Sequence, residues 1–240
     1  MAGVRVVSLV PSLTEAVAVS APGALVGATE WCSHPEDLDV ARVGGTKNPD
    51  VRRIIGLAPD LVIANEEENR APDLAALRAA GIQVLVTEVR DLPGAFRELA
   101  RVLAACGAGR PGWLADAEAA WGQLPQPDVR LTAVIPIWRR PWMVLGSDTF
   151  AGDLLGRLGV DNAYATHAER YPRVPVEELR AVAPDVVVLP DEPYRFTGED
   201  GPEEFPTPSA LVSGRHLTWY GPSLAQAPAV LSEALRAACR

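Results

Sequence analysis

Residues 54–70, IIGLAPDLVIANEEENR, are the stretch from which the fold can be predicted. The end of a helix is followed by Ala58-Pro59-Asp60 and then by a short apolar strand near 60–64. The same order returns about 125 residues later in ELRAVAPDVVVLPDEPYRF (178–196), where Ala183-Pro184-Asp185 precedes another apolar strand. The sequence therefore predicts one helix–strand unit that is used twice.

Strand and helix patterns alternate along almost the whole chain, which is typical of α/β folds with parallel sheets. We expect strands at 4–10, 24–30, 60–64 and 82–89 in the first half. The helices between them are expected after Pro11, at 49–57, and from Ala71 to a glycine stop at Gly81. Ser12 and Glu15 have the spacing of a capping box for the first of these helices.

The composition changes between Arg110 and Asp128, where a helical centre is flanked by proline and glycine. Trp113 and Trp121 lie eight residues apart, close to one helical face, and we interpret them as packing residues. The predicted organisation is an N-terminal α/β lobe (1–108), a linker helix (109–128) and a C-terminal α/β lobe (129–240).

Two loops have equivalent positions in the repeated unit. Residues 65–70 follow the strand of the first lobe, and residues 190–196 follow the corresponding strand of the second. Because ligands of open parallel sheets bind beyond the carboxyl ends of the strands, we expect both loops to line one cleft between the lobes.

The bulk composition excludes several function classes. The net charge is −9 without a basic stripe, which argues against nucleic acid and against anionic membranes as partners. No apolar run is long enough for a secretory signal or a membrane span, so the chain as given is expected to be cytoplasmic, or periplasmic or at the cell surface if a leader was removed. The three cysteines are widely spaced, so we expect no disulfide framework and no metal site.

Motifs of catalysis are missing from the sequence: it contains no GxSxG, Walker A or HExxH pattern. SLTE (12–15) and GSDT (146–149) are interpreted as helix caps. Cys32 and His34 are two residues apart on a loop and cannot easily face each other, so no catalytic residue is predicted.

Several motifs in order along the chain resemble a known family. RVVSLVPSLTEAV, GGTKNPD, LAPDLVIA and TWYGP are similar to the helical-backbone (class III) solute-binding proteins of corrinoid, haem and iron-chelate ABC importers, and most similar to the vitamin B12-binding members. The resemblance implies a non-enzymatic protein that holds a metal chelate such as cobalamin, haem or a ferric chelate. It implies no further cofactor.

The resemblance and the strand-end positions together give the predicted ligand contacts. Family members place a corrin-facing aromatic residue at the position of Trp31 and cleft residues near Asn65, Trp142 and Trp219. The residues themselves add aromatic rings, hydrogen-bonding groups and charges in the same loops. The predicted ligand-binding set is Trp31, His34, Asn65, Glu66, Asn69, Trp138, Arg139, Trp142, Tyr194 and Trp219.

Alternatives remain for the charged groups. The acidic run Glu66–Glu68 is either a solvated loop or a wall of the cleft, where it would pair with Arg139 and Arg140. The same groups would act on a small anionic substrate if the fold were re-used as an enzyme or enzyme accessory, and a protein partner is a third alternative.

A permease is the partner that the resemblance implies, because importers of this family dock through one surface acid on each lobe. The corresponding positions here are Ala71 and Gly221, so the docking acids are not matched. Acids that could substitute are Glu66–Glu68, Asp73 and Glu203.

Overall fold

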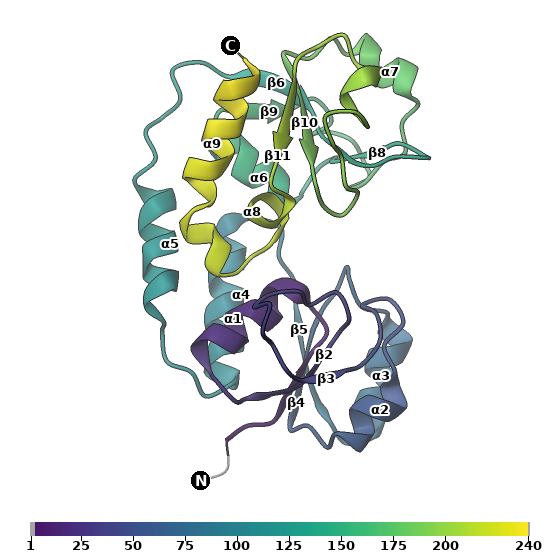
Figure 1. The fold of residues 1–240 in the computed structure, drawn as a ribbon, viewed down its shortest axis with the longest axis vertical. Helices are drawn as coiled ribbons and strands as arrows, with labels where there is room; N and C mark the ends of the chain where they lie inside the picture. Colours follow the sequence, from purple (N-terminus) through teal and green to yellow (C-terminus); the bar gives the residue numbers. More distant parts are fainter. Residues whose placement is uncertain (1–2, 240) are drawn as a thin grey trace. The chain divides into compact units, whose positions relative to one another are not determined.

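The computed structural model describes residues 3–239, and the chain divides into two compact α/β units (Figure 1). The first unit comprises the chain up to Glu88 together with Gly94–Ala115 and Tyr220–Pro222. The second comprises Val89–Pro93, Asp116–Trp219 and the chain from Ser223 onward. Helix α5 (Gly112–Gly122) contains the point of division, which falls after Ala115. The predicted α/β class with parallel sheets is confirmed.

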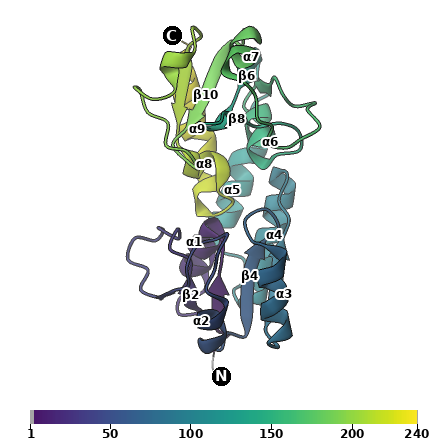
Figure 2. The same ribbon diagram turned by 90° about the vertical axis from the view of Figure 1, so that its right-hand side faces the viewer.

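The first unit is built on a parallel sheet with the strand order β3-β2-β1-β4-β5. Helices cover both faces of this sheet, with α1 and α4 on one side and α2 and α3 on the other (Figures 1 and 2). The strands are β1 (Val6–Ser8), β2 (Leu25–Ala28), β3 (Ala41–Arg42), β4 (Leu61–Asn65) and β5 (Gln83–Thr87). The helices are α1 (Pro11–Ser20), α2 (Val51–Gly56), α3 (Ala71–Ala79) and α4 (Leu92–Ala105). The edge strand β3 is too short for the pattern to predict.

The second unit repeats this plan with a parallel sheet of order β11-β10-β6-β9 and a separate antiparallel pair, β7 with β8. Helix α9 packs along β11 and contacts α8 (yellow in Figures 1 and 2). The strands are β6 (Leu131–Val134), β7 (Pro136–Trp138), β8 (Met143–Val144), β9 (Val160–Asn162), β10 (Val186–Pro190) and β11 (Ser209–Val212). The helices are α6 (Phe150–Arg157), α7 (Val176–Ala181), α8 (Gly214–Thr218) and α9 (Ala227–Ala238), with 3₁₀ turns η1 (Pro202–Glu204) and η2 (Pro222–Ala225).

Each unit has its own apolar core against its central strands. In the first unit Val62 of β4 packs with Ile54 of α2 and Leu77 of α3, and all three are fully buried. In the second unit Val187 of β10 packs with Leu179 of α7. The central strands are apolar on both faces because helices cover both sides of each sheet.

The repeat predicted from the two Ala-Pro-Asp sequences is confirmed in atomic detail. The carboxylate of Asp60 accepts a hydrogen bond from the backbone N–H of Arg5 at 2.8 Å, and the Asp60 N–H donates to the Arg5 carbonyl at 2.8 Å. Asp185 makes the same pair of bonds with Thr132, at 2.7 and 2.8 Å. Both alanines adopt positive φ, 46° and 49°. Each junction therefore joins the residue before β4 or β10 to the start of the neighbouring strand, β1 or β6. The strand order β2-β1-β4-β5 of the first sheet thus corresponds to β9-β6-β10-β11 of the second.

The predicted capping box is wrong. Helix α1 begins at Pro11, and its N-cap, Val10, makes no side-chain cap bond. Proline at the first helical position supplies a pre-set φ and has no N–H to satisfy, so the helix begins before Ser12. The Thr14 hydroxyl donates to the Val10 carbonyl at 2.9 Å instead.

The predicted packing role of the two tryptophans of α5 is confirmed, one in each unit. The indole N–H of Trp113 donates to the Ser20 hydroxyl at 3.0 Å in the first unit. That of Trp121 donates to the Leu224 carbonyl at 3.0 Å in the second, where its side chain is buried.

We expect Asp60→Ala and Asp185→Ala to lower the free energy of unfolding by similar amounts, about 1 kcal/mol each. Each change removes a carboxylate that accepts a hydrogen bond from the central strand. Urea unfolding followed by circular dichroism measures this. Asp37→Ala, at an exposed loop position, is the control and should change stability by less than about 0.5 kcal/mol. A clear effect of only one of the two junction variants would contradict the equivalence of the junctions.

Candidate functional site

In the first unit the carboxyl ends of the parallel strands bring three loops to one edge. The loop after β2 carries Trp31, which is 68% exposed, and the loop after β4 carries the acidic run. The third loop follows β3, and a Cβ atom placed on its Gly45 would lie 3.4 Å from the Trp31 indole nitrogen. The Trp31 ring therefore lies against this turn while most of its surface faces solvent. An exposed indole offers a broad apolar face and one N–H donor to a ligand.

The asparagines of this edge organise the loop after β4. Asn65 and Asn69 are both buried. The side-chain oxygen Oδ1 of Asn65 accepts a hydrogen bond from the backbone N–H of Glu67 at 2.9 Å, and its side-chain amide donates to the Thr87 carbonyl at 3.1 Å. The Asn69 oxygen accepts the N–H of Asn65 at 2.8 Å, and its amide donates to the Thr46 carbonyl at 3.0 Å. Both amides are thus bound to neighbouring segments of the first unit, β5 and the loop after β3, and their contact with a ligand stays a prediction.

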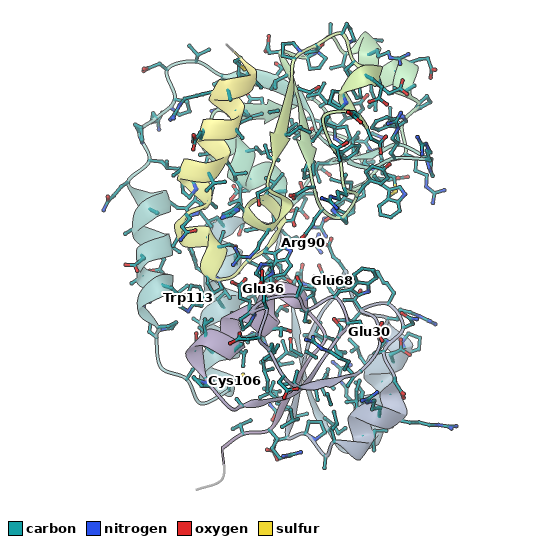
Figure 3. The ribbon with its side chains drawn as sticks, in the orientation of Figure 1. Glu30, Glu36, Glu68, Arg90, Cys106 and Trp113 are labelled. Atoms are coloured by element: carbon teal, nitrogen blue, oxygen red, sulfur yellow. The ribbon has the colours of Figure 1, made fainter. Side chains whose placement is uncertain are left out.

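The three glutamates of the acidic run differ in their surroundings. Glu66 is exposed, whereas Glu68 is half-buried and lies at the same edge as Glu30 (Figure 3). Burial raises the pKa of Glu68 to about 7, and the nearby Lys47 ammonium opposes this shift. Lys47 also donates to the backbone carbonyl of Glu67. The run is therefore not a uniformly solvated loop.

In the second unit the equivalent edge carries a chain of aromatic rings. Trp138, 42% exposed, ends β7, and its ring centroid lies 5.6 Å from that of Tyr194 in the loop after β10. Tyr194 contacts Phe196 at 4.7 Å, and Phe196 stacks on Trp142 at 5.9 Å. Phe196 is buried and Trp142 is half-buried, so the chain runs from solvent into the core.

Arg139, one residue beyond Trp138, is only 7% exposed and is surrounded by carboxylates. Its guanidinium pairs with Glu203 at 2.6 Å, with Glu204 at 2.8 Å and with Asp200. It also lies 5.2 Å from the Trp142 ring centroid. These partners all belong to the second unit.

The carboxylates that hold this guanidinium belong to its own unit, and the pairing of Arg139 with Glu66–Glu68 that the sequence left open stays a prediction. The enzyme alternative needed the same group for an anionic substrate and loses its best cation. Arg140 is 75% exposed and approaches Asp200 only at 4.0 Å.

The remaining predicted residues have these positions. Trp219 is buried, and its indole N–H donates to the Glu192 carboxylate at 2.9 Å within the second unit. His34 is half-buried, with Nδ1 3.1 Å from the Ser33 hydroxyl. Contacts of Trp142, Trp219 and His34 with a ligand stay predictions.

Sequence reasoning missed a polar pocket in the second unit, with a volume of about 310 Å³. Arg90 pairs with Asp148 at 2.7 Å at this pocket (Arg90 is labelled in Figure 3). Thr149 caps α6 by position but makes no side-chain cap bond, and its buried hydroxyl has no hydrogen-bond partner within the described chain. The sequence signal for this pocket was GSDT (146–149), which we interpreted only as a helix cap.

Residues 3–239 contain neither of two further features, a cluster of metal ligands and a helix that could span a membrane. No group of three or more His, Cys, Asp and Glu side chains in this range could hold a metal ion. None of the helices described there has the length and apolarity to cross a membrane.

Comparison with known proteins gives distant but consistent relatives. No protein-family model matches this chain. A vitamin B12-binding protein of Vibrio campbellii is 24% identical over 190 residues, which cover 76% of this chain and 69% of the relative. An uncharacterized ABC transporter substrate-binding lipoprotein of Bacillus subtilis is 32% identical over 108 residues, 43% of this chain and 34% of the relative.

The solved structures agree with these relatives. A periplasmic haem-binding protein of Pseudomonas aeruginosa matches with a TM-score of 0.80 and 26% identity, over 100% of this chain and 95% of that one. The resemblance predicted from the sequence is therefore confirmed. The named relatives are binding proteins rather than enzymes.

We expect Arg139→Met to lower the free energy of unfolding by about 2 kcal/mol, because it leaves Asp200, Glu203 and Glu204 facing one another without their shared cation. The partial exposure of these carboxylates keeps the loss below that of a fully buried pair. Arg140→Met is the matched control on the exposed neighbour, with an expected change below about 0.5 kcal/mol. Equal urea midpoints for the two variants would refute the structural role of Arg139.

The half-buried carboxyl of Glu68 should make stability depend on pH. Its pKa lies near 7 in the folded chain against an ordinary value of 4.5, so the folded state holds the proton more tightly. Stability from this group is therefore present below about pH 4.5 and is lost as the pH rises through about 7.

Glu68→Gln removes this dependence. We expect it to match the unmodified chain at about pH 4 and to exceed it at about pH 8 by up to ~3 kcal/mol. Thermal or urea unfolding across this range measures the difference, with Glu66→Gln as the exposed control. Parallel pH profiles for the unmodified chain and Glu68→Gln would exclude a raised pKa at this position.

Proposed function

We propose that this chain is a non-enzymatic binding protein for a metal chelate of the corrinoid or haem class. In this proposal the contact surface of each unit is its exposed indole, Trp31 after β2 in the first unit and Trp138 at the end of β7 in the second. The single observation that carries the proposal is the placement of these rings: each unit presents one solvent-facing tryptophan at the edge where ligands of parallel sheets bind. The names of the relatives supply the ligand class.

The chemistry of the two rings suits a flat, weakly polar ligand. An indole offers a broad apolar face and one N–H donor, so it can stack on a macrocycle and still bind a peripheral amide or carboxylate. The macrocycle would bring its own metal ligands, so the protein would recognise the chelate through its rim and face.

A transporter is the partner that this function would serve, as a substrate-binding protein of an ABC importer. Docking would need acids other than those of the family positions. Gly221 is buried, and a Cβ atom there would lie 3.0 Å from the Ser12 carbonyl oxygen, so this position has little room for a side chain. Ala71 is the first residue of α3 and is exposed. Glu66 is the exposed acid of the preceding loop. An import role would place the chain outside the cytoplasmic membrane.

Tryptophan fluorescence titrations with cyanocobalamin, haemin and a ferric catecholate test the proposal. We expect saturable quenching by cyanocobalamin or haemin, with micromolar or tighter affinity, on the order of −8 kcal/mol or better, and the ferric catecholate as the non-macrocyclic comparison. Trp31→Ala and Trp138→Ala should each weaken binding about tenfold, the equivalent of ~1.4 kcal/mol, because each removes one stacking face.

Val129→Ala is the matched control. Val129 is also exposed, but it lies before β6, at the amino end of the strand, so this change should leave the affinity unaltered. Isothermal calorimetry provides a second measurement that does not depend on the indoles. Flat traces in both methods for cyanocobalamin and haemin would exclude the proposed ligand class.

A further inference from the structure

Trp138 makes an edge contact that leaves it available for stacking. The planes of Trp138 and Tyr194 are inclined by 75°, with centroids 5.6 Å apart. In such a T-shaped pair the two rings do not share parallel faces, and a quadrupole attraction favours the geometry. The contact therefore fixes the inclination of the indole while 42% of the Trp138 surface stays exposed.

Tyr194 is in turn fixed by its hydroxyl. This group donates to one carboxylate oxygen of Asp200 at 2.5 Å, while the other oxygen of Asp200 pairs with Arg139. Arg139 is buried and is shared with Glu203 and Glu204 of the 3₁₀ turn η1. We call the series Tyr194, Asp200 and Arg139 the tyrosine brace.

The brace connects an exposed ring to a rigid ionic cluster. A solvent-facing indole on a loop can normally rotate about two side-chain torsions, and binding a ligand then costs the entropy of fixing them. Tyr194 lies at one side of the Trp138 ring and cannot swing away without breaking its bond to Asp200. Trp138 is therefore oriented before a ligand arrives.

We infer that Tyr194 is a positioning residue, which holds the Trp138 indole in the orientation that stacks on the ligand. This inference rests on the proposed function, since it assigns Trp138 to the ligand. The inference goes beyond the proposed function because it gives the hydroxyl of Tyr194, as well as its ring, a role in the binding surface. Tyr194 was predicted from the sequence as a direct ligand contact, and the brace gives it an indirect role.

The decisive variant is Tyr194→Phe, which keeps the ring against Trp138 and removes only the bond to Asp200. Tyr164→Phe is the matched control in the same unit, because the buried Tyr164 hydroxyl has no hydrogen-bond partner among the described residues. The full chain is labelled with 5-fluorotryptophan, and a Trp138→Phe variant assigns the ¹⁹F resonance of Trp138. The Trp138 resonance is then compared without ligand in both tyrosine variants.

We expect Tyr194→Phe to shift or broaden the Trp138 resonance and to leave those of the other five tryptophans in place. Tyr164→Phe should change none of the six. An unaltered Trp138 resonance in Tyr194→Phe would overturn the inference. If Tyr194→Phe were to move all six resonances, the hydroxyl would be a general structural element, and the positioning role would likewise be excluded.

Binding is the second measurement. Titration with cyanocobalamin and haemin should show affinity about three- to tenfold weaker in Tyr194→Phe than in the unmodified chain. Tyr164→Phe should bind like the unmodified chain. If neither probe binds the unmodified chain, the proposed function fails, while the fluorine spectra still decide whether the brace orients Trp138. If the probes bind Tyr194→Phe with unaltered affinity, the positioning role is excluded although the function stands.

Discussion

Parallel pairing of the central strands is the constraint on which the rest of the structure depends. β1 pairs with β4 in the first unit and β6 with β10 in the second, and in each case the Ala-Pro-Asp junction connects the start of one strand to the other. Because parallel strands all end at the same edge, the loops that follow them must gather there whatever their sequence. The aromatic and charged side chains of these loops are thus brought together by the topology.

The two edges stabilise their loops by different chemistry. In the first unit, neutral amides fold the loop after β4, since Asn65 and Asn69 are buried without the cost of burying a charge. In the second unit, a buried guanidinium holds the loop after β10 through three carboxylates. A polar residue at a strand end therefore either supports its own loop or contacts a ligand. The hydrogen-bond partners of the residue show which of these two roles it has.

Much of the fold could be predicted from the sequence because its signals are local. The Ala-Pro-Asp repeat and the apolar strands after it lie within a few residues, and they gave the class and the correspondence of the two sheets. The same sequence argument placed Trp31, Trp138 and Trp219 in loops or at strand ends, and it could not distinguish the two exposed rings from the buried Trp219. The partners of Arg139 could not be predicted, because Asp200 and Glu204 are 61 and 65 residues away in the chain. The start of α1 was predicted wrongly because Ser12 and Glu15 have the spacing of a capping box, whereas the helix already begins at Pro11.

The row of rings that runs from Trp142 through Phe196 and Tyr194 to Trp138 has an optical consequence. Neighbouring centroids in this row are separated by 4.7 to 5.9 Å, a spacing at which excitation passes between aromatic chromophores faster than they emit. The energy collects on the ring with the lowest excited state, which is the indole in the most polar surroundings, Trp138. Light absorbed by the inner rings of this row therefore reaches the solvent-facing indole at its end.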